Sequence, residues 1–177
     1  MDNESFEALL RHVVLGRLAP FGLASKGRTV YLYNDHLTIS LIRLGGRMAL
    51  PGSIAHVLCF RHSFLRGMDG KVATAPPSNV FAYPYKVKPH DDVDRELGYR
   101  PQNLHFDYEH LHRESTGEDA IVQKLDRIAA FIGGRFLCWA EALTLEHAKS
   151  ELAQYGEGAW CERMWNDDYA ARLTAAS

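Results

Sequence analysis

The chain has 177 residues, of which 46% are hydrophobic and 24% are charged, and its formal net charge is −2. This composition is typical of a globular domain and excludes a disordered chain, a collagen, a disulfide scaffold and a strongly basic nucleic-acid-binding protein. At this length we expect a single domain over residues 1–177, with a core large enough to fold without a metal ion or a disulfide.

The first half of the chain predicts one helix followed by strands. Residues 4–18 form an amphipathic helix, because their apolar side chains recur at helical spacing, and Asn3 is expected to cap it. Two short segments, 29–33 and 37–41, are joined by an Asn-Asp turn and predict a β-hairpin. The long strand predicted over 53–64 has apolar residues on both faces, which is typical of a central strand.

The middle of the chain is richer in turn-forming and polar residues. A loop is predicted over 66–79, and a short edge strand over 80–83, where Pro84 follows. Residues 86–104 are the most polar stretch and predict a long exposed loop, a kind of segment that is often functional.

The last third of the chain predicts helices. A capping-box pattern and an apolar stripe indicate a helix over 115–132, which Gly133-Gly134 is expected to end. Further helices are predicted over 136–143, 144–155 and 160–173. Strands joined by short turns and followed by a block of helices favour an α+β fold, in which an antiparallel sheet carries the N-terminal helix and the C-terminal helices on one face.

Aromatic and acidic residues gather in and around the predicted 86–104 loop. Protein interfaces favour tyrosine, and a long polar loop is a suitable place for one. A sheet also favours aromatic residues, so this pattern has a structural explanation as well. The residues expected to bind a protein partner are Tyr83, Tyr85, Asp91, Asp92, Asp94, Tyr99 and Tyr108.

A second cluster follows the same loop and combines imidazoles with a carboxylate. Transition metals favour these ligands, so His105, Asp107, His110 and His112 are candidate metal ligands of a metal-dependent hydrolase. The alternative is a solvated segment with no metal. The chain has no HExxH or Cys-x-x-Cys pattern to support the site, and no other cofactor is predicted.

Known catalytic motifs are missing from the sequence. It contains no nucleophile elbow, no P-loop and no dinucleotide-binding fingerprint, which counts modestly against an enzyme. The three cysteines, Cys59, Cys138 and Cys161, are interpreted as small core residues, and their odd number fits a reducing compartment.

A resemblance adds to this reading. The segments that carry it are Pro20 to Gly27, Leu37 to Arg43, Arg61-His62-Ser63, Leu137 to Ala142 and Thr144-Leu145-Glu146. Over residues 5–155 the chain resembles a bacterial family of small domains of unknown function. The resemblance implies the order helix, sheet, helices and no established catalytic residue. Similar domains are found beside contact-dependent toxins as immunity proteins.

The sequence therefore favours a non-catalytic protein-binding module of the bacterial cytoplasm, either an immunity-type or an accessory protein, over a metal-dependent hydrolase. No nucleic-acid partner is expected. No membrane association is expected either, because no apolar run approaches the roughly 18 residues that a membrane span requires. The acidic N-terminus differs from the basic start of a secretory signal. No pattern indicates an oligomeric state.

Overall fold

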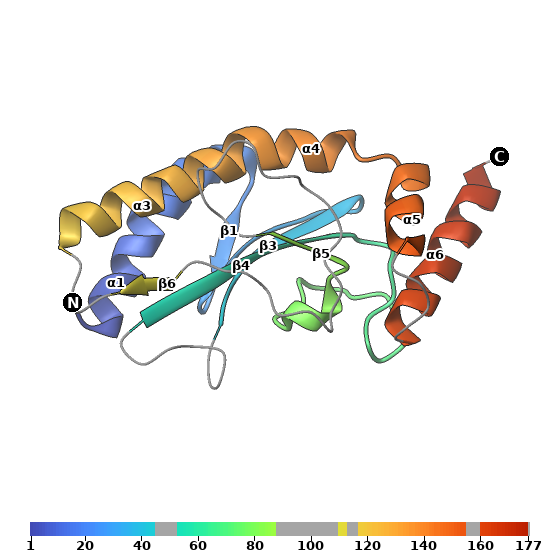
Figure 1. Cartoon of the computed structure of the whole chain (residues 1–177), viewed down its shortest axis with the longest axis horizontal. Helices are drawn as coiled ribbons and strands as arrows, with labels where there is room; N and C mark the ends of the chain where they lie inside the picture. Colours follow the sequence, from blue (N-terminus) through green and yellow to red (C-terminus); the bar gives the residue numbers. More distant parts are fainter. Residues whose placement is uncertain (45–52, 88–109, 113–116, 155–159, 177) are drawn as a thin grey trace.

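The computed structural model describes residues 1–44, 53–87, 110–112, 117–154 and 160–176. It has an α+β fold in which an antiparallel sheet is combined with an N-terminal helical segment and C-terminal helices. Figure 1 shows the long helical segment of residues 118–142 along one side of the sheet, and the two termini at opposite ends of the molecule. The fold class predicted from the sequence is confirmed.

The N-terminal helical segment covers the predicted residues without a break. It consists of α1 (Asn3–Leu10), the π-helical η1 (Arg11–Leu15), α2 (Gly16–Leu18) and the short 3-10 helix η2 (Ala19–Phe21). The cap is Asp2 and not Asn3, because the Asp2 carboxylate accepts a hydrogen bond of 2.8 Å from the backbone N–H of Ser5. Gly22 ends the segment with a φ of 83°, which glycine adopts without a steric penalty.

All neighbouring strands of the sheet are antiparallel. The strands are β1 (Ala24–Lys26), β2 (Thr29–Tyr33), β3 (Leu37–Arg43), β4 (Ser53–His62), β5 (Tyr85–Val87) and β6 (His110–His112). Their order is β1-β2-β3-β4-β5, and β6 also pairs with β4. Phe60 faces Tyr85 of β5, and Ala55 faces His110 of β6. Thus β5 and β6 lie one after the other along the same edge of β4.

The predicted hairpin of β2 and β3 is confirmed. Its turn is held by Asn34, whose side-chain oxygen accepts hydrogen bonds of 2.9 Å from the backbone N–H groups of His36 and Leu37. The preceding strand, β1, was not predicted. It pairs with β2 through a two-residue turn whose first residue, Gly27, has a φ of 59°. Glycine at this position is typical of a type II′ hairpin turn, so the Gly-Arg pair was a usable signal.

Two predicted elements between β4 and the last helices were wrong. Residues 80–83 do not form an edge strand, because Val80–Ala82 is the 3-10 helix η4, capped by a hydrogen bond of 2.9 Å from Phe81 N–H to the Asn79 side chain. The predicted exposed loop does not start at residue 86, because residues 86 and 87 belong to β5. Residues 88–104 of that loop lie outside the described residues.

The C-terminal helices follow the prediction except at Gly133-Gly134. They are α3 (Glu118–Phe131), the π-helical η5 (Ile132–Phe136), α4 (Leu137–Ala142), α5 (Leu145–Ala153) and α6 (Trp160–Ala176). The two glycines do not end a helix, since α3, η5 and α4 are continuous. A Cβ at Gly133 would lie 3.1 Å from the Phe21 ring and 3.2 Å from the Leu18 side chain. This glycine therefore permits close packing of η5 on the N-terminal helical segment.

The starts of α5 and α3 differ, because only α5 has a side-chain cap. Thr144 caps α5 as predicted, since its hydroxyl accepts a hydrogen bond of 3.2 Å from the backbone N–H of His147. The start of α3 differs from the predicted capping box: its N-cap residue is Gly117, which has no side-chain cap. The box residue Ser115 lies outside the described residues.

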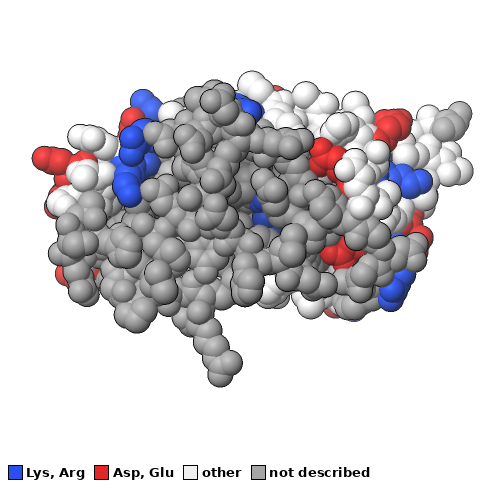
Figure 2. All heavy atoms as spheres, viewed as in Figure 1, with Lys and Arg blue, Asp and Glu red and all other residues white. Residues whose placement is uncertain are grey.

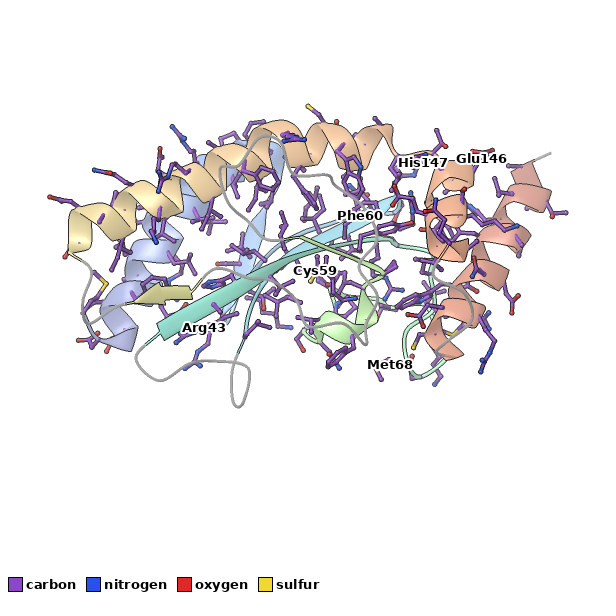
Figure 3. All side chains as sticks on the ribbon, in the orientation of Figure 1. Arg43, Cys59, Phe60, Met68, Glu146 and His147 are labelled. Carbon is purple, nitrogen blue, oxygen red and sulfur yellow. The ribbon has the colours of Figure 1, made fainter. Side chains whose placement is uncertain are left out.

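The sheet separates two hydrophobic clusters. The larger one joins Leu58 and Phe60 of β4 to all the main helices, so the helices pack on one face as predicted. The smaller one joins Val57 and Cys59 of β4 to η4 on the opposite face. Figure 3 shows Phe60 directed toward α4 and Cys59 directed to the other side of the strand. The two-sided burial predicted for the central strand is confirmed.

No single described helix has the length and apolar character needed to cross a membrane. The pair formed by Glu118–Ala142 and Leu145–Ala153, which bends by 93°, meets this requirement by length and composition alone.

Candidate functional site

The face of the sheet opposite the helices carries a row of polar side chains, and we call it the polar face. Strand register places Tyr31, Ser40, Cys59 and Lys86 side by side on four neighbouring strands. Paired residues of antiparallel strands project from the same side of a sheet. Ser40, Cys59 and Lys86 are almost completely buried, so this polar row lies beneath another part of the chain.

Residues 66–84, which we call the cover segment, lie over this face. Tyr83 from this segment packs into the same cluster as Cys59. Its hydroxyl donates a hydrogen bond of 2.7 Å to the carbonyl oxygen of Pro77 and lies 2.7 Å from Ser40 Oγ. Because a phenol has only one proton to donate, Ser40 is the donor in the second bond.

A buried arginine of β4 holds both ends of the cover segment. The Arg61 guanidinium donates a hydrogen bond of 2.7 Å to the carbonyl oxygen of Ala82, and a second one to that of Leu65, the residue directly before the cover segment. Burial lowers the pKa of Arg61. These charge-assisted bonds offset the cost of removing the guanidinium from water. The cover segment is therefore fixed to the sheet near its first and its last residues.

Lys86 is the second buried cation of the polar face. Burial lowers its pKa to about 8, and its ammonium donates a hydrogen bond to the carbonyl oxygen of Tyr83. On the facing strand, burial raises the pKa of the Cys59 thiol to about 12. A thiol that keeps its proton is a poor nucleophile, so Cys59 acts here as a small core residue.

The outer side of the cover segment exposes apolar side chains. Met68 is 48% exposed, Val72 is 53% exposed and Phe81 is 36% exposed. Tyr33 of β2 lies next to them: it is 38% exposed, and its hydroxyl donates a hydrogen bond of 3.1 Å to the carbonyl oxygen of Ala73. These exposed apolar side chains come from one short segment, which makes its outer side a candidate contact surface.

A cavity of about 310 Å³ opens between the cover segment and the hairpin of β1 and β2. The hairpin contributes the charged Lys26 and the polar-face residues Thr29 and Tyr31. The cover segment contributes Pro76 and Ser78. The cavity combines a cation, hydroxyl groups and flat apolar walls, which is a suitable lining for a small ligand.

The two tyrosines expected on an exposed binding surface are not exposed. Tyr83 and Tyr85 are both 0% exposed. The Tyr83 side chain is packed between the cover segment and the sheet. The Tyr85 hydroxyl donates a hydrogen bond of 2.8 Å to the carbonyl oxygen of Ala148 in α5. Burial raises the pKa of both phenols. Both side chains complete the fold, so the exposure that was expected of them is not found.

Most of the other predicted site residues lie outside the described part of the chain. The seven that lie outside the described residues are Asp91, Asp92, Asp94, Tyr99, His105, Asp107 and Tyr108. His110 and His112 belong to β6 and face Ala55 and Ser53 of β4. Within the described parts of the chain, no three His, Cys, Asp or Glu side chains come close enough together to hold a metal ion. The metal site stays a prediction.

Two of the three cysteines follow the prediction of core residues. Cys59 and Cys161 are buried, whereas Cys138 is exposed on α4. The cover segment and its exposed side chains were missed, because residues 66–79 were interpreted only as a loop. Met68 and Val72 within a polar, glycine-containing stretch were the available signal.

Comparison with known proteins adds no relative: the chain matches no family model, no curated protein and no solved structure.

Proposed function

We propose that the protein is a non-catalytic module that binds a protein partner through the outer side of the cover segment. The observation that carries this proposal is the contrast between the two sides of that segment. Its inner side is fixed by Arg61 and Tyr83, whereas its outer side exposes Met68, Val72 and Phe81. Apolar groups on a fixed backbone bind with a small loss of conformational entropy.

The contacts within the cover segment support a fixed outer surface. Asn79 accepts a hydrogen bond from Phe81 N–H, and its amide lies 3.9 Å from the Met68 sulfur. An isolated bridge pairs Arg66 with Val72. Binding residues are commonly carried on loops that a rigid scaffold positions.

The surface of α5 and α6, at the other end of the molecule, differs from the cover segment because it is charged. Figure 2 shows acidic and basic side chains interspersed over α5 and α6 on the visible face. Such a mixture is typical of a solvated surface. The apolar side chains of the cover segment are therefore the preferred contact surface.

The sequence resemblance to bacterial domains associated with toxins suggests the class of partner. In this proposal the protein acts in the bacterial cytoplasm as an immunity-type or accessory protein, and the partner is a toxin domain. The proposal needs no catalytic group on the polar face, where Cys59 keeps its proton and the Lys86 ammonium is bonded to a carbonyl oxygen.

Site-specific photo-crosslinking in the cells that encode the protein tests this function. A photoreactive residue is placed at Val72 or Phe81. The matched control carries it at Phe21, which is 52% exposed and lies beside Gly133 in the helical layer. We expect one partner to be captured from the first two positions and not from the third.

The captured partner is then purified and titrated with variants. Val72→Asp and Met68→Asp are expected to weaken binding by at least about tenfold, since a charge is buried in an apolar contact. Phe21→Asp should leave the affinity unchanged. Equal capture from Phe21, or binding that tolerates both cover-segment substitutions, would refute the proposal.

The metal-dependent hydrolase keeps one supporting observation. His110 and His112, two of its four expected ligands, lie together in the short strand β6 at the edge of the sheet. Metal analysis of untagged protein decides this alternative: stoichiometric zinc or manganese that disappears in His110→Ala would support it, and metal-free protein would exclude it.

A further inference from the structure

The geometry of the cavity between the β1–β2 hairpin and the cover segment points to a second binding site. We propose that it binds a small planar anion, namely an aromatic ring that carries a carboxylate or a phosphate. The site is separate from the exposed apolar surface of the cover segment, and it is tested with purified protein alone. Four features of its lining lead to this ligand.

The first feature is charge. Lys26 is the only charged residue among the described residues that line the cavity. It is exposed, and no ion pair in the described part of the chain engages it. A lysine ammonium is a compact charge with three rotatable donors, which suits an anionic oxygen. A ligand with a carboxylate or phosphate is therefore favoured over a neutral or cationic one.

The second feature is the pair of flat walls. Tyr31 lines the cavity from β2, and Pro76 lines it from the cover segment. Both rings present flat surfaces, and an aromatic ligand placed against them would bury apolar area and stack on the tyrosine. Thr29 and Ser78 add hydroxyl groups, one on each side, which can bond to polar atoms of the ligand.

The third feature is size. About 310 Å³ is close to the lower limit of cavities that hold small ligands. This volume accommodates one aromatic ring with its anionic group. At the hairpin turn, a Cβ on Gly27 would meet no atom within 4 Å, so the turn leaves open space beside Lys26.

The fourth feature is the fixed position of the walls. The carbonyl oxygen of Pro77, between the lining residues Pro76 and Ser78, accepts the hydrogen bond from the buried Tyr83 hydroxyl. The carbonyl oxygen of Ala73 accepts one from Tyr33. The opposite wall belongs to the paired strands β1 and β2. Both walls exist before a ligand binds, which favours binding.

An NMR titration of the purified 20.0 kDa protein tests the site. The probes are benzoate, phenyl phosphate and the neutral benzyl alcohol. We expect benzoate, phenyl phosphate or both to cause saturable shifts of the backbone amides of Gly27 and Thr29. Benzyl alcohol should bind about fivefold more weakly or worse, since a partly exposed charge contributes about 1 kcal/mol. The stronger anion shows whether the site prefers carboxylates or phosphates.

Variants make the test specific. Lys26→Met should weaken binding of the anions by about fivefold, whereas Lys71→Met should not change it, because Lys71 is an exposed lysine of the cover segment that does not line the cavity. Ala75→Trp, at an exposed lining position, should fill the cavity and abolish the shifts. The proposal is overturned if no probe gives saturable shifts, if benzyl alcohol binds as tightly as the anions, or if Lys26→Met and Lys71→Met behave alike.

Discussion

The phenol oxygen of Tyr169 lies 2.7 Å from Nδ1 of His62. This bond joins α6 to the last residue of β4 across 107 positions of the sequence. Burial lowers the pKa of His62 to about 4 and raises that of Tyr169 well above 10. At neutral pH the imidazole is therefore uncharged and the phenol keeps its proton, so the bond joins two neutral groups.

Removal of the Tyr169 hydroxyl should destabilise the protein. Tyr169→Phe leaves a buried imidazole nitrogen without its partner, which costs about 1–3 kcal/mol of unfolding free energy. Urea denaturation measures the change. The control is Thr174→Ala on the same helix, whose exposed hydroxyl donates to the carbonyl oxygen of Ala170 and whose loss should cost less than about 0.5 kcal/mol. Equal effects of the two substitutions would contradict the assigned role of Tyr169.

Stability should fall as the pH decreases below 6.5. Burial lowers the pKa of His62 to about 4, and burial together with the positive charge of Arg43 lowers that of His56 to about 3. The unfolded chain binds protons at both histidines near pH 6.5, whereas the folded protein does not, so acid favours unfolding. Between pH 6 and pH 5 we expect a loss of about 2–3 kcal/mol in the free energy of unfolding.

Urea denaturation at several pH values measures this slope. The variant His56→Leu removes one of the two titrating groups, so its slope should be about half that of the parent protein. The quantity compared is the slope of the unfolding free energy against pH. If the substitution itself changes the stability by the same amount at every pH, this slope is not affected. A flat profile between pH 6 and pH 5, or an unchanged slope in the variant, would show that these histidines are not buried as described.

The two adjacent glycines of η5 should respond differently to substitution. Gly134 has open space around it, so Gly134→Ala should raise the unfolding free energy by about 0.5–1 kcal/mol through helix propensity. At Gly133 the added Cβ meets the buried Leu18 and the ring of Phe21, which offsets that gain. Thermal denaturation of the two variants should place Gly134→Ala above Gly133→Ala. The reverse order would contradict the close packing at Gly133.

The ion pair that holds α6 to the segment after β4 should contribute more than an exposed one. Asp168 is 10% exposed and accepts hydrogen bonds of 2.6 Å and 2.9 Å from the side chain and backbone of Arg66. Asp168→Ala should cost about 1–3 kcal/mol. Asp126→Ala breaks the pair with Arg17, in which both side chains are about half exposed, and should cost less than about 1 kcal/mol. Similar losses in chemical denaturation would refute the difference.

Local patterns predicted the elements whose signals lie within one stretch of chain. The apolar stripe over residues 4–18, the turn at Asn34 and the cap at Thr144 depend on neighbouring residues, and the structure confirms each. The two-sided apolar pattern of β4 also correctly indicated a central strand with a cluster on each face.

The candidate site is formed by residues that are far apart in the sequence, so local sequence patterns predicted little of it. Tyr83 was expected to bind a partner because it lies beside the predicted 86–104 loop, but its hydroxyl bonds to Ser40, 43 positions away. The cavity likewise combines Lys26 with Pro76, which are close only after the cover segment folds over the sheet.

The amino-acid sequence by itself determined which sides of the helices and strands are apolar, and therefore the α+β class. Only the tertiary structure decided which neighbour covers each side: why Gly133 continues a helix against Leu18, and why Tyr85 lies inside. The physical reason is that periodicity records the direction in which a side chain must be buried. The partner that buries it is set by packing and hydrogen bonding across the whole chain.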